Sequence, residues 1–121
     1  MKPYKGVLYR GTSKAAGYDV GPVHTLSIIG PSSTVKIKLN IRFPKGLPKP
    51  ALLILRSSYQ NKGLIQPSVG LIDEDYKENL FLTVHNVSKN DVWIRREERI
   101  AQLIFIDAVQ PYEIKPLRGE R

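Results

Sequence analysis

The sequence predicts an all-β protein of sandwich or barrel type, and three observations support this fold class. Apolar and polar residues alternate over residues 34–43, which is the period of a strand with one buried face. Turn-forming residues recur roughly every ten residues, a spacing typical of sandwiches and barrels. No stretch of the sequence shows sustained helical periodicity. Since a chain of 121 residues has room for one core, we expect a single domain over residues 1–121.

The other strand predictions rest on short runs of apolar and β-branched residues between turn signals. Residues 51–55 are apolar throughout, which predicts a buried strand. Residues 64–69 are predicted to form a hairpin with its tip near Pro67-Ser68, because both residue types favour turns. The remaining predicted strands are 7–10, 24–29, 79–87, 92–94, 99–106 and 112–114.

A short helix is predicted at residues 57–62, directly after a strand that ends in Arg56. Ser57 and Ser58 open this helix and can act as its caps. Free backbone N–H groups at a helix start favour an anion, and Arg56 adds a charge-assisted fork. The segment is therefore a candidate phosphate cradle. Taken alone, a surface arginine followed by an ordinary cap is the simpler explanation.

The composition excludes several classes of protein. The chain has no cysteine, so it can form neither a disulfide framework nor a thiolate metal site. With only two histidines, a histidine-based zinc site would also need carboxylate ligands. No apolar run reaches the length of a membrane span, and the first residues do not resemble a signal peptide. We therefore expect a soluble intracellular protein without membrane binding, located in the cytoplasm or nucleus, or in the host cell if the chain is viral.

The formal net charge of +8 is compatible with two kinds of partner. One is nucleic acid, to which a basic surface is attracted without sequence preference. The other is a polyphosphate substrate. Because the lysines and arginines are spread along the chain and do not interleave with aromatic residues, nucleic-acid binding is the less expected of the two.

An acidic segment at residues 73–76 is a candidate nucleotide site. Asp73, Glu74 and Asp75 repel one another unless a positive group lies near. A carboxylate can orient and deprotonate a water molecule or hold a divalent cation. Tyr76 adds a flat face for a sugar or a base. The alternative explanation is a solvated acidic turn.

Two further polar residues are candidate ligands. Asp19 lies in an early loop after Gly17, where it could bind a cation through water or accept backbone hydrogen bonds in a plain turn. Gln102 is an amide within an otherwise apolar strand. Because burying it without a partner would cost about 1–3 kcal/mol, we expect Gln102 to meet a polar group.

In order and spacing, four motifs of the chain together resemble the trimeric dUTP pyrophosphatase (dUTPase) family. They are Ala-Gly-Tyr-Asp at 16–19, Arg-Ser-Ser at 56–58, Gly-Leu-Ile-Asp-Glu-Asp-Tyr at 70–76 and Arg-Ile-Ala-Gln-Leu at 99–103. The resemblance, from about Gly11 to Arg121, implies a distorted β-barrel of jelly-roll type and a homotrimer with active sites between subunits. It also implies Mg²⁺-dependent hydrolysis of dUTP to dUMP and pyrophosphate, which lowers dUTP and supplies dUMP for thymidylate synthesis.

The resemblance also implies a role for each matching residue. Asp73 would activate the water that attacks the α-phosphate, and Tyr76 would stack under the deoxyribose. The predicted hairpin would read uracil, mostly through backbone groups. Asp19 would position Mg²⁺ through water. The residues implied to bind substrate are Arg56, Ser57, Ser58 and Gln102 at the phosphates, and Pro67, Gly70, Leu71, Ile72 and Tyr76 at the nucleoside.

The chain departs from the family pattern in three places. Glu78 and Glu97 stand where the family usually has turn glycines. The glycine-rich tail of the family, with its phenylalanine, would lie beyond Arg121; without it we expect substrate binding to survive and turnover to fall. The alternatives are a dCTP deaminase of the same superfamily and a dUTPase-like nucleotide-binding regulatory protein with weak catalysis.

Overall fold

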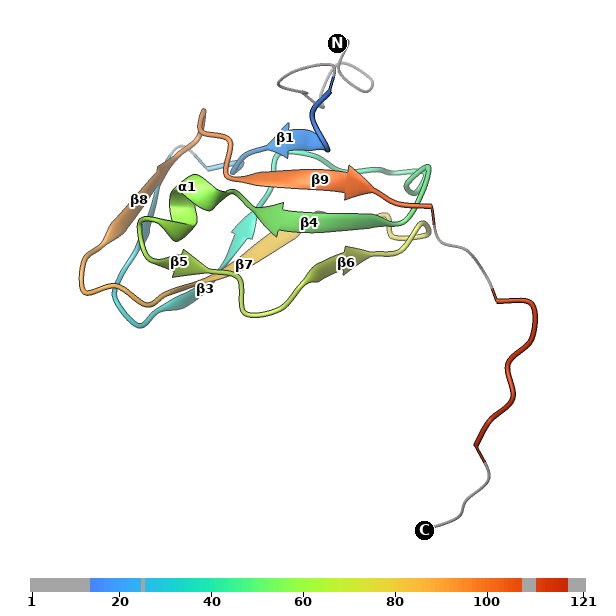
Figure 1. Ribbon diagram of the computed structural model, residues 1–121. Coiled ribbons are helices and arrows are strands. Elements are labelled where there is room, and N and C mark those ends of the chain that lie inside the picture. Colours follow the sequence, from blue (N-terminus) through green and yellow to red (C-terminus); the bar gives the residue numbers. More distant parts are fainter. Residues whose placement is uncertain (1–13, 25, 108–110, 118–121) are drawn as a thin grey trace.

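The computed structural model describes residues 14–24, 26–107 and 111–117 (Figure 1). Within these residues the chain forms nine short strands and a single short helix, which confirms the all-β prediction. In chain order the elements are β1 (Tyr18–Val20), β2 (Leu26–Ile29), β3 (Thr34–Lys38), β4 (Ala51–Leu55), α1 (Ser57–Gln60), β5 (Leu64–Ile65), β6 (Gly70–Ile72), β7 (Phe81–Asn86), β8 (Val92–Arg95) and β9 (Ala101–Phe105). No helix of the described residues is long and apolar enough to cross a membrane.

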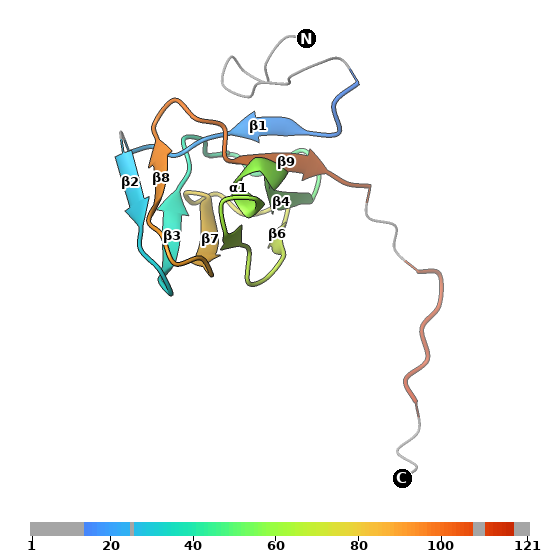
Figure 2. The same ribbon diagram turned by 60° about the vertical axis from the view of Figure 1, so that its left-hand side comes forward.

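The strands form three antiparallel sheets. The largest has the strand order β1-β9-β4-β6, the second pairs β2 with β8, and the third has the order β3-β7-β5. In Figure 2 the strand axes of the antiparallel β2–β8 and β3–β7 pairs are roughly aligned, and β1 and β9 cross one end of these pairs. Neighbours within a sheet come from distant parts of the sequence, as in a jelly-roll-like barrel.

One hydrophobic cluster joins the three sheets. Alternate residues of each strand point into it, so that Leu53 in β4, Leu103 in β9 and Val84 in β7 are at most 1% exposed. Each such side chain contributes about 1.5–3 kcal/mol on burial. Asn86 is fully buried among them, and its amide donates to the carbonyl oxygens of Ile29 and Asn90 at 2.9 and 2.8 Å, which offsets the cost of burying it.

The long strand predicted at residues 34–43 is shorter in the structure. Strand β3 ends at Lys38; Leu39 makes an isolated bridge to Pro22, and its backbone N–H donates to the Leu80 carbonyl oxygen at 2.8 Å. The backbone N–H of Asn40 then donates to the Gly21 carbonyl oxygen at 3.0 Å, so the chain leaves the β3–β7 ladder after Leu39. The alternation nevertheless persists, since Ile41 and Phe43 are buried. The predicted strands 24–29, 79–87, 92–94 and 99–106 agree to within two residues at each end with β2, β7, β8 and β9, and β4 has the predicted bounds 51–55.

The predicted hairpin at residues 64–69 is wrong. Strand β5 pairs with β7, whereas β6 pairs with β4, so residues 66–69 connect two different sheets. Residues 112–114, also predicted as a strand, form none. The predicted strand at 7–10 lies outside the described residues.

Candidate active site

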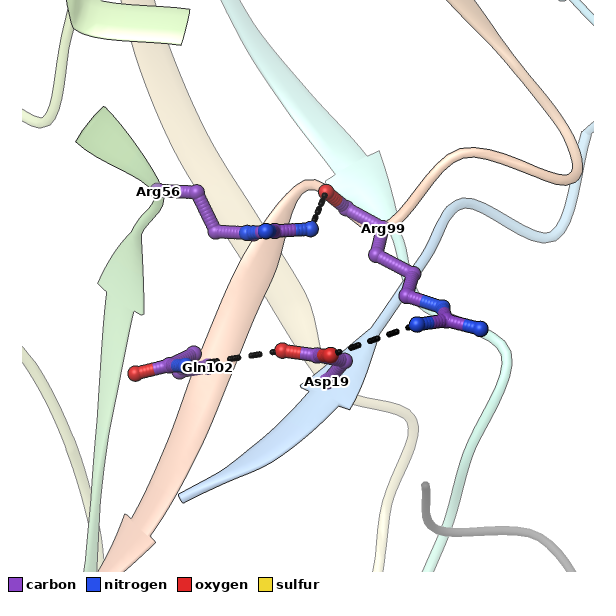
Figure 3. A network of polar contacts seen from close by, with 4 residues as sticks. All are labelled: Asp19, Arg56, Arg99 and Gln102. Carbon is purple, nitrogen blue, oxygen red and sulfur yellow. Dashed lines mark hydrogen bonds and ion pairs between the residues drawn. The ribbon is translucent and has the colours of Figure 1, made fainter. Parts of the chain in front are cut away.

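The first polar cluster of the site lies on the four-stranded sheet. Asp19 in β1 is paired with Gln102 in β9, and Gln102 is paired with Ile54 in β4, so the three side chains lie on one face. Gln102 Nε2 lies 3.5 Å from Asp19 Oδ1, and Arg99 Nη1 lies 3.7 Å from Asp19 Oδ2. Arg56 Nη1 donates to the Arg99 carbonyl oxygen at 3.1 Å. Figure 3 shows Asp19 between Gln102 and Arg99.

Burial explains why these residues associate. Asp19 is only 9% exposed, and an isolated carboxylate at that depth would be strongly destabilising. Arg99 compensates its charge and Gln102 contacts its second oxygen. The expectation that Gln102 meets a polar group is therefore confirmed. Arg99 was missed by the sequence analysis as a partner of Asp19, although it stands two residues before β9, the strand of Gln102.

The start of α1 completes this cluster. Arg56 is the N-cap residue of α1, with φ −69° and ψ 145°. Among the described residues, no side chain makes a capping hydrogen bond at this helix start. Ser57 and Ser58 are thus the first helical residues, and their predicted role as caps is wrong. A cavity of about 260 Å³ is lined by Ile54, Leu55, Arg56, Ser57 and Gln102. Ser58 does not line this cavity, so the structure brings together three of the four residues implied to hold phosphates.

Helix α1 is anchored to the turn after β8 by Tyr59. Tyr59 is 5% exposed, and its hydroxyl donates to Glu98 Oε2. Glu98 Oε1 accepts from the backbone N–H of Arg95 at 3.1 Å. Burial, and then the hydrogen bond and the charge of Glu98, raise the pKa of Tyr59 well above its ordinary value of 10.0. The hydroxyl therefore stays protonated and holds the helix that carries Ser57.

The second cluster surrounds Asp73. A cavity of about 310 Å³ takes Leu53 from β4, Gly70–Ile72 from β6, Asp73 and Tyr76 from the turn, and Leu80 before β7. Three residues missed by the sequence analysis also line it: Lys36, Phe81 and Thr83. In their strands, inward-facing and outward-facing residues alternate. The sequence pattern therefore identifies these residues as outward-facing, but it does not show which cavity they line. The exposed residue Pro67 lies outside both cavities.

The acidic turn has a defined conformation. The backbone N–H of Tyr76 donates to the carbonyl oxygen of Asp73 at 3.1 Å, and the Tyr76 hydroxyl donates to the Asn79 carbonyl oxygen at 2.6 Å. The backbone N–H of Leu47 donates to the Glu74 carbonyl oxygen at 2.7 Å. Asp73 is exposed and Tyr76 is 37% exposed, so both can reach a ligand.

The two clusters are separate within one chain. The residues that line the Asp73 cavity and those that line the Arg56 cavity have no member in common. Asp19 and Gly70–Ile72 lie on the two edge strands of the four-stranded sheet, which three strand spacings of about 4.8 Å separate. A ligand that used Asp73, Tyr76 and Asp19 together would have to bridge this sheet or meet groups from two chains.

The fold and the two clusters define the class of protein. The dUTPase family model matches residues 4–120, and the chain belongs to the dUTPase family. A relative from frog virus 3 is 33% identical over 113 residues, covering 91% of this chain and 64% of its own length. The human mitochondrial deoxyuridine 5'-triphosphate nucleotidohydrolase is 33% identical over 96 residues, covering 78% of this chain and 37% of its own.

Solved structures agree with this assignment. The dUTPase of Streptococcus mutans is 28% identical, with a TM-score of 0.72, and the match covers 88% of each chain. The jelly-roll-like fold implied by the resemblance is therefore confirmed. The chain spans less than two thirds of the length of the frog virus 3 and human relatives.

Proposed function

We propose that the protein hydrolyses dUTP to dUMP and pyrophosphate. The observation that carries this proposal is the grouping of the family's motifs into two half-sites. Asp19, Arg56 and Gln102 meet in one cluster, and Asp73 and Tyr76 line one cavity. The first offers donors for phosphates, and the second offers a carboxylate beside an aromatic ring.

In the proposed reaction, Asp73 orients a water molecule and takes its proton. The water oxygen bonds to the α-phosphorus, and the bond from that phosphorus to the oxygen bridging to the β-phosphate breaks, which releases pyrophosphate. Tyr76 packs against the deoxyribose, where its ring leaves little room for a 2′-hydroxyl. Its own hydroxyl is bonded to the Asn79 carbonyl oxygen, which fixes the ring. Arg56, Ser57 and Gln102 bind the phosphates and stabilise the charge that develops on them.

Mg²⁺ fits the residues of the first cluster. This ion usually takes one or two carboxylates together with waters and substrate phosphates. Asp19 supplies one carboxylate in contact with Gln102 and Arg99, and within the described residues no group of three or more His, Cys, Asp or Glu side chains could form a protein cage. Asp19 would therefore hold through water an ion that arrives with the triphosphate, and the ion would neutralise phosphate charge.

We further propose that the active site forms between chains of a homotrimer. Strand β4 is apolar at every position, yet Leu52 is only half-buried and Ile54 is 39% exposed. Leu71, which pairs with Leu52, is 62% exposed. An apolar outer face of this kind favours burial against another copy. Such a contact would also bring the Asp73 half-site of one chain to the Arg56 half-site of the next.

The two glutamates that replace family turn glycines do not strain the backbone. Among the described residues, the one non-glycine residue with positive φ is Ser32. Glu78 and Glu97 therefore adopt backbone conformations that any residue accepts, and both side chains are exposed. The match to the dUTPase family does not favour the dCTP deaminase alternative.

The proposal is tested by incubating the protein and Mg²⁺ with dUTP, dCTP, dTTP or UTP, and measuring pyrophosphate and ammonia. We expect pyrophosphate from dUTP alone, and a fall of at least about a hundredfold in kcat for Asp73→Asn, the size typical of a lost general base. Ammonia from dCTP would identify a deaminase instead. Tight dUTP binding without turnover would favour a regulatory protein.

A further inference from the structure

Gln66 makes two hydrogen bonds that tie the connection between β5 and β6 to strand β4. Its Oε1 accepts from the backbone N–H of Leu55 at 3.0 Å, and its Nε2 donates to the Leu53 carbonyl oxygen at 2.7 Å. Strand β6 pairs with β4 only as far as Leu53. The Gln66 amide therefore takes the place of a strand residue at the point where the β6 ladder stops.

The other end of the same connection is equally close to β4. A Cβ atom on Gly70 would lie 3.1 Å from both the Cβ and the carbonyl oxygen of Leu53, and 3.5 Å from Gln66 Nε2. Three exposed residues, 67–69, lie between these two points. The connection is thus a short loop with both ends fixed on Leu53, and its second end enters the Asp73 cavity at Gly70.

We propose that Gln66 is a positioning residue for the nucleoside base, an inference that rests on the proposed function. Backbone groups of a loop can read a base only if the loop is held to within about 0.5 Å. Gln66 provides this constraint, because its two bonds set where Gly70 and Leu71 meet the cavity. Since Leu55 directly precedes Arg56, the same amide also joins the connection between β5 and β6 to the strand that presents the phosphate-binding arginine.

The first test variant is Gln66→Glu. Its carboxylate keeps an acceptor for Leu55 N–H but presents oxygen instead of N–H to the Leu53 carbonyl, which repels it. When protonated, the new carboxyl can donate to Leu53 again. We expect the ratio of kcat/KM for dUTP to kcat/KM for dTTP to fall about tenfold at pH 8, the factor that corresponds to one hydrogen bond. Selective binding of dUMP over dTMP should return as the pH is lowered through about 4.3, the ordinary pKa of a glutamate.

A second variant and a matched control separate positioning from folding. Gln66→Asn keeps the amide but is one methylene too short, so it should lose selectivity at high and low pH alike. Gln60→Glu makes the same chemical change beside Leu55, whose carbonyl oxygen lies 3.4 Å from Gln60 Nε2, without touching the loop. This control should keep the selectivity of the original protein.

Three results would overturn the inference. One is an unchanged dUTP-to-dTTP ratio in folded Gln66→Glu and Gln66→Asn. Another is an equal loss of kcat/KM for both substrates, which would indicate a purely structural role. If the unsubstituted protein does not hydrolyse dUTP, the proposed function fails together with this inference; if it does and the variants match it, only the inference fails.

Discussion

Replacing Tyr59 by phenylalanine removes one hydroxyl and leaves the ring burial unchanged. The lost interaction is a hydrogen bond to the carboxylate of Glu98, a type that stabilises a protein by about 1.5–3 kcal/mol. Glu98 keeps its bond to the backbone N–H of Arg95, so we expect a loss near the lower limit, about 1.5 kcal/mol of unfolding free energy at pH 7. Because Tyr59 anchors α1, kcat/KM for dUTP should fall as well.

The pH dependence of the free energy of unfolding provides a sharper test. The pKa of Tyr59 is raised in the folded protein, so the stabilisation is complete below the unfolded pKa of about 10 and is lost as pH rises through the folded value. Urea denaturation of both proteins between pH 7 and pH 11 should therefore show a difference that shrinks only above about pH 10. A difference that is zero at pH 7, or that grows above pH 10, would refute the role assigned to this pair.

Two other substitutions test the remaining parts of the site. Arg99→Met leaves the buried Asp19 carboxylate without its cation and should lower the free energy of unfolding by about 1–3 kcal/mol in urea denaturation. Lys49→Met, the control, removes an exposed ion pair and should lower it by less than about 1 kcal/mol. Equal losses in the two variants would contradict the role of Arg99. Gly46→Ala, at φ +86° with its Cβ 2.5 Å from the Glu74 carbonyl oxygen, should lower the thermal midpoint and displace the acidic turn. Gly30→Ala is the matched control, since its nearest neighbour is 3.5 Å away; a Gly46 variant as stable and active as this control would show that the turn tolerates a side chain.

Local pattern was sufficient to predict much of the fold. The apolar run at 51–55 is bounded by turn residues on both sides, so its limits could be read from the sequence and agree with β4. Gln102 was predicted to need a polar partner because one amide stood among apolar residues, and that partner is Asp19. Both inferences depend on residues close together in the chain.

The errors concern interactions between distant residues. The connection at 66–69 resembles a hairpin locally, but pairing of β5 with β7 and of β6 with β4 is decided by the packing of three sheets. The predicted serine caps fail because Arg56, held by its backbone N–H to the Ile100 carbonyl oxygen, becomes the N-cap residue. Lys36 and Phe81 border the Asp73 cavity only because β3 and β7 lie beside it. None of these relations has a signature in a short window of sequence.

The proposed shared site combines the Asp73 half of one chain with the Arg56 half of another. It is tested most directly by refolding an equal mixture of Asp73→Asn and Arg56→Ala chains, each nearly inactive alone, and measuring dUTP hydrolysis. If each site draws one half at random from each of two chains, about one quarter of the sites are intact, so about a quarter of the original activity should return. A mixture that remains as inactive as its components would contradict the shared site.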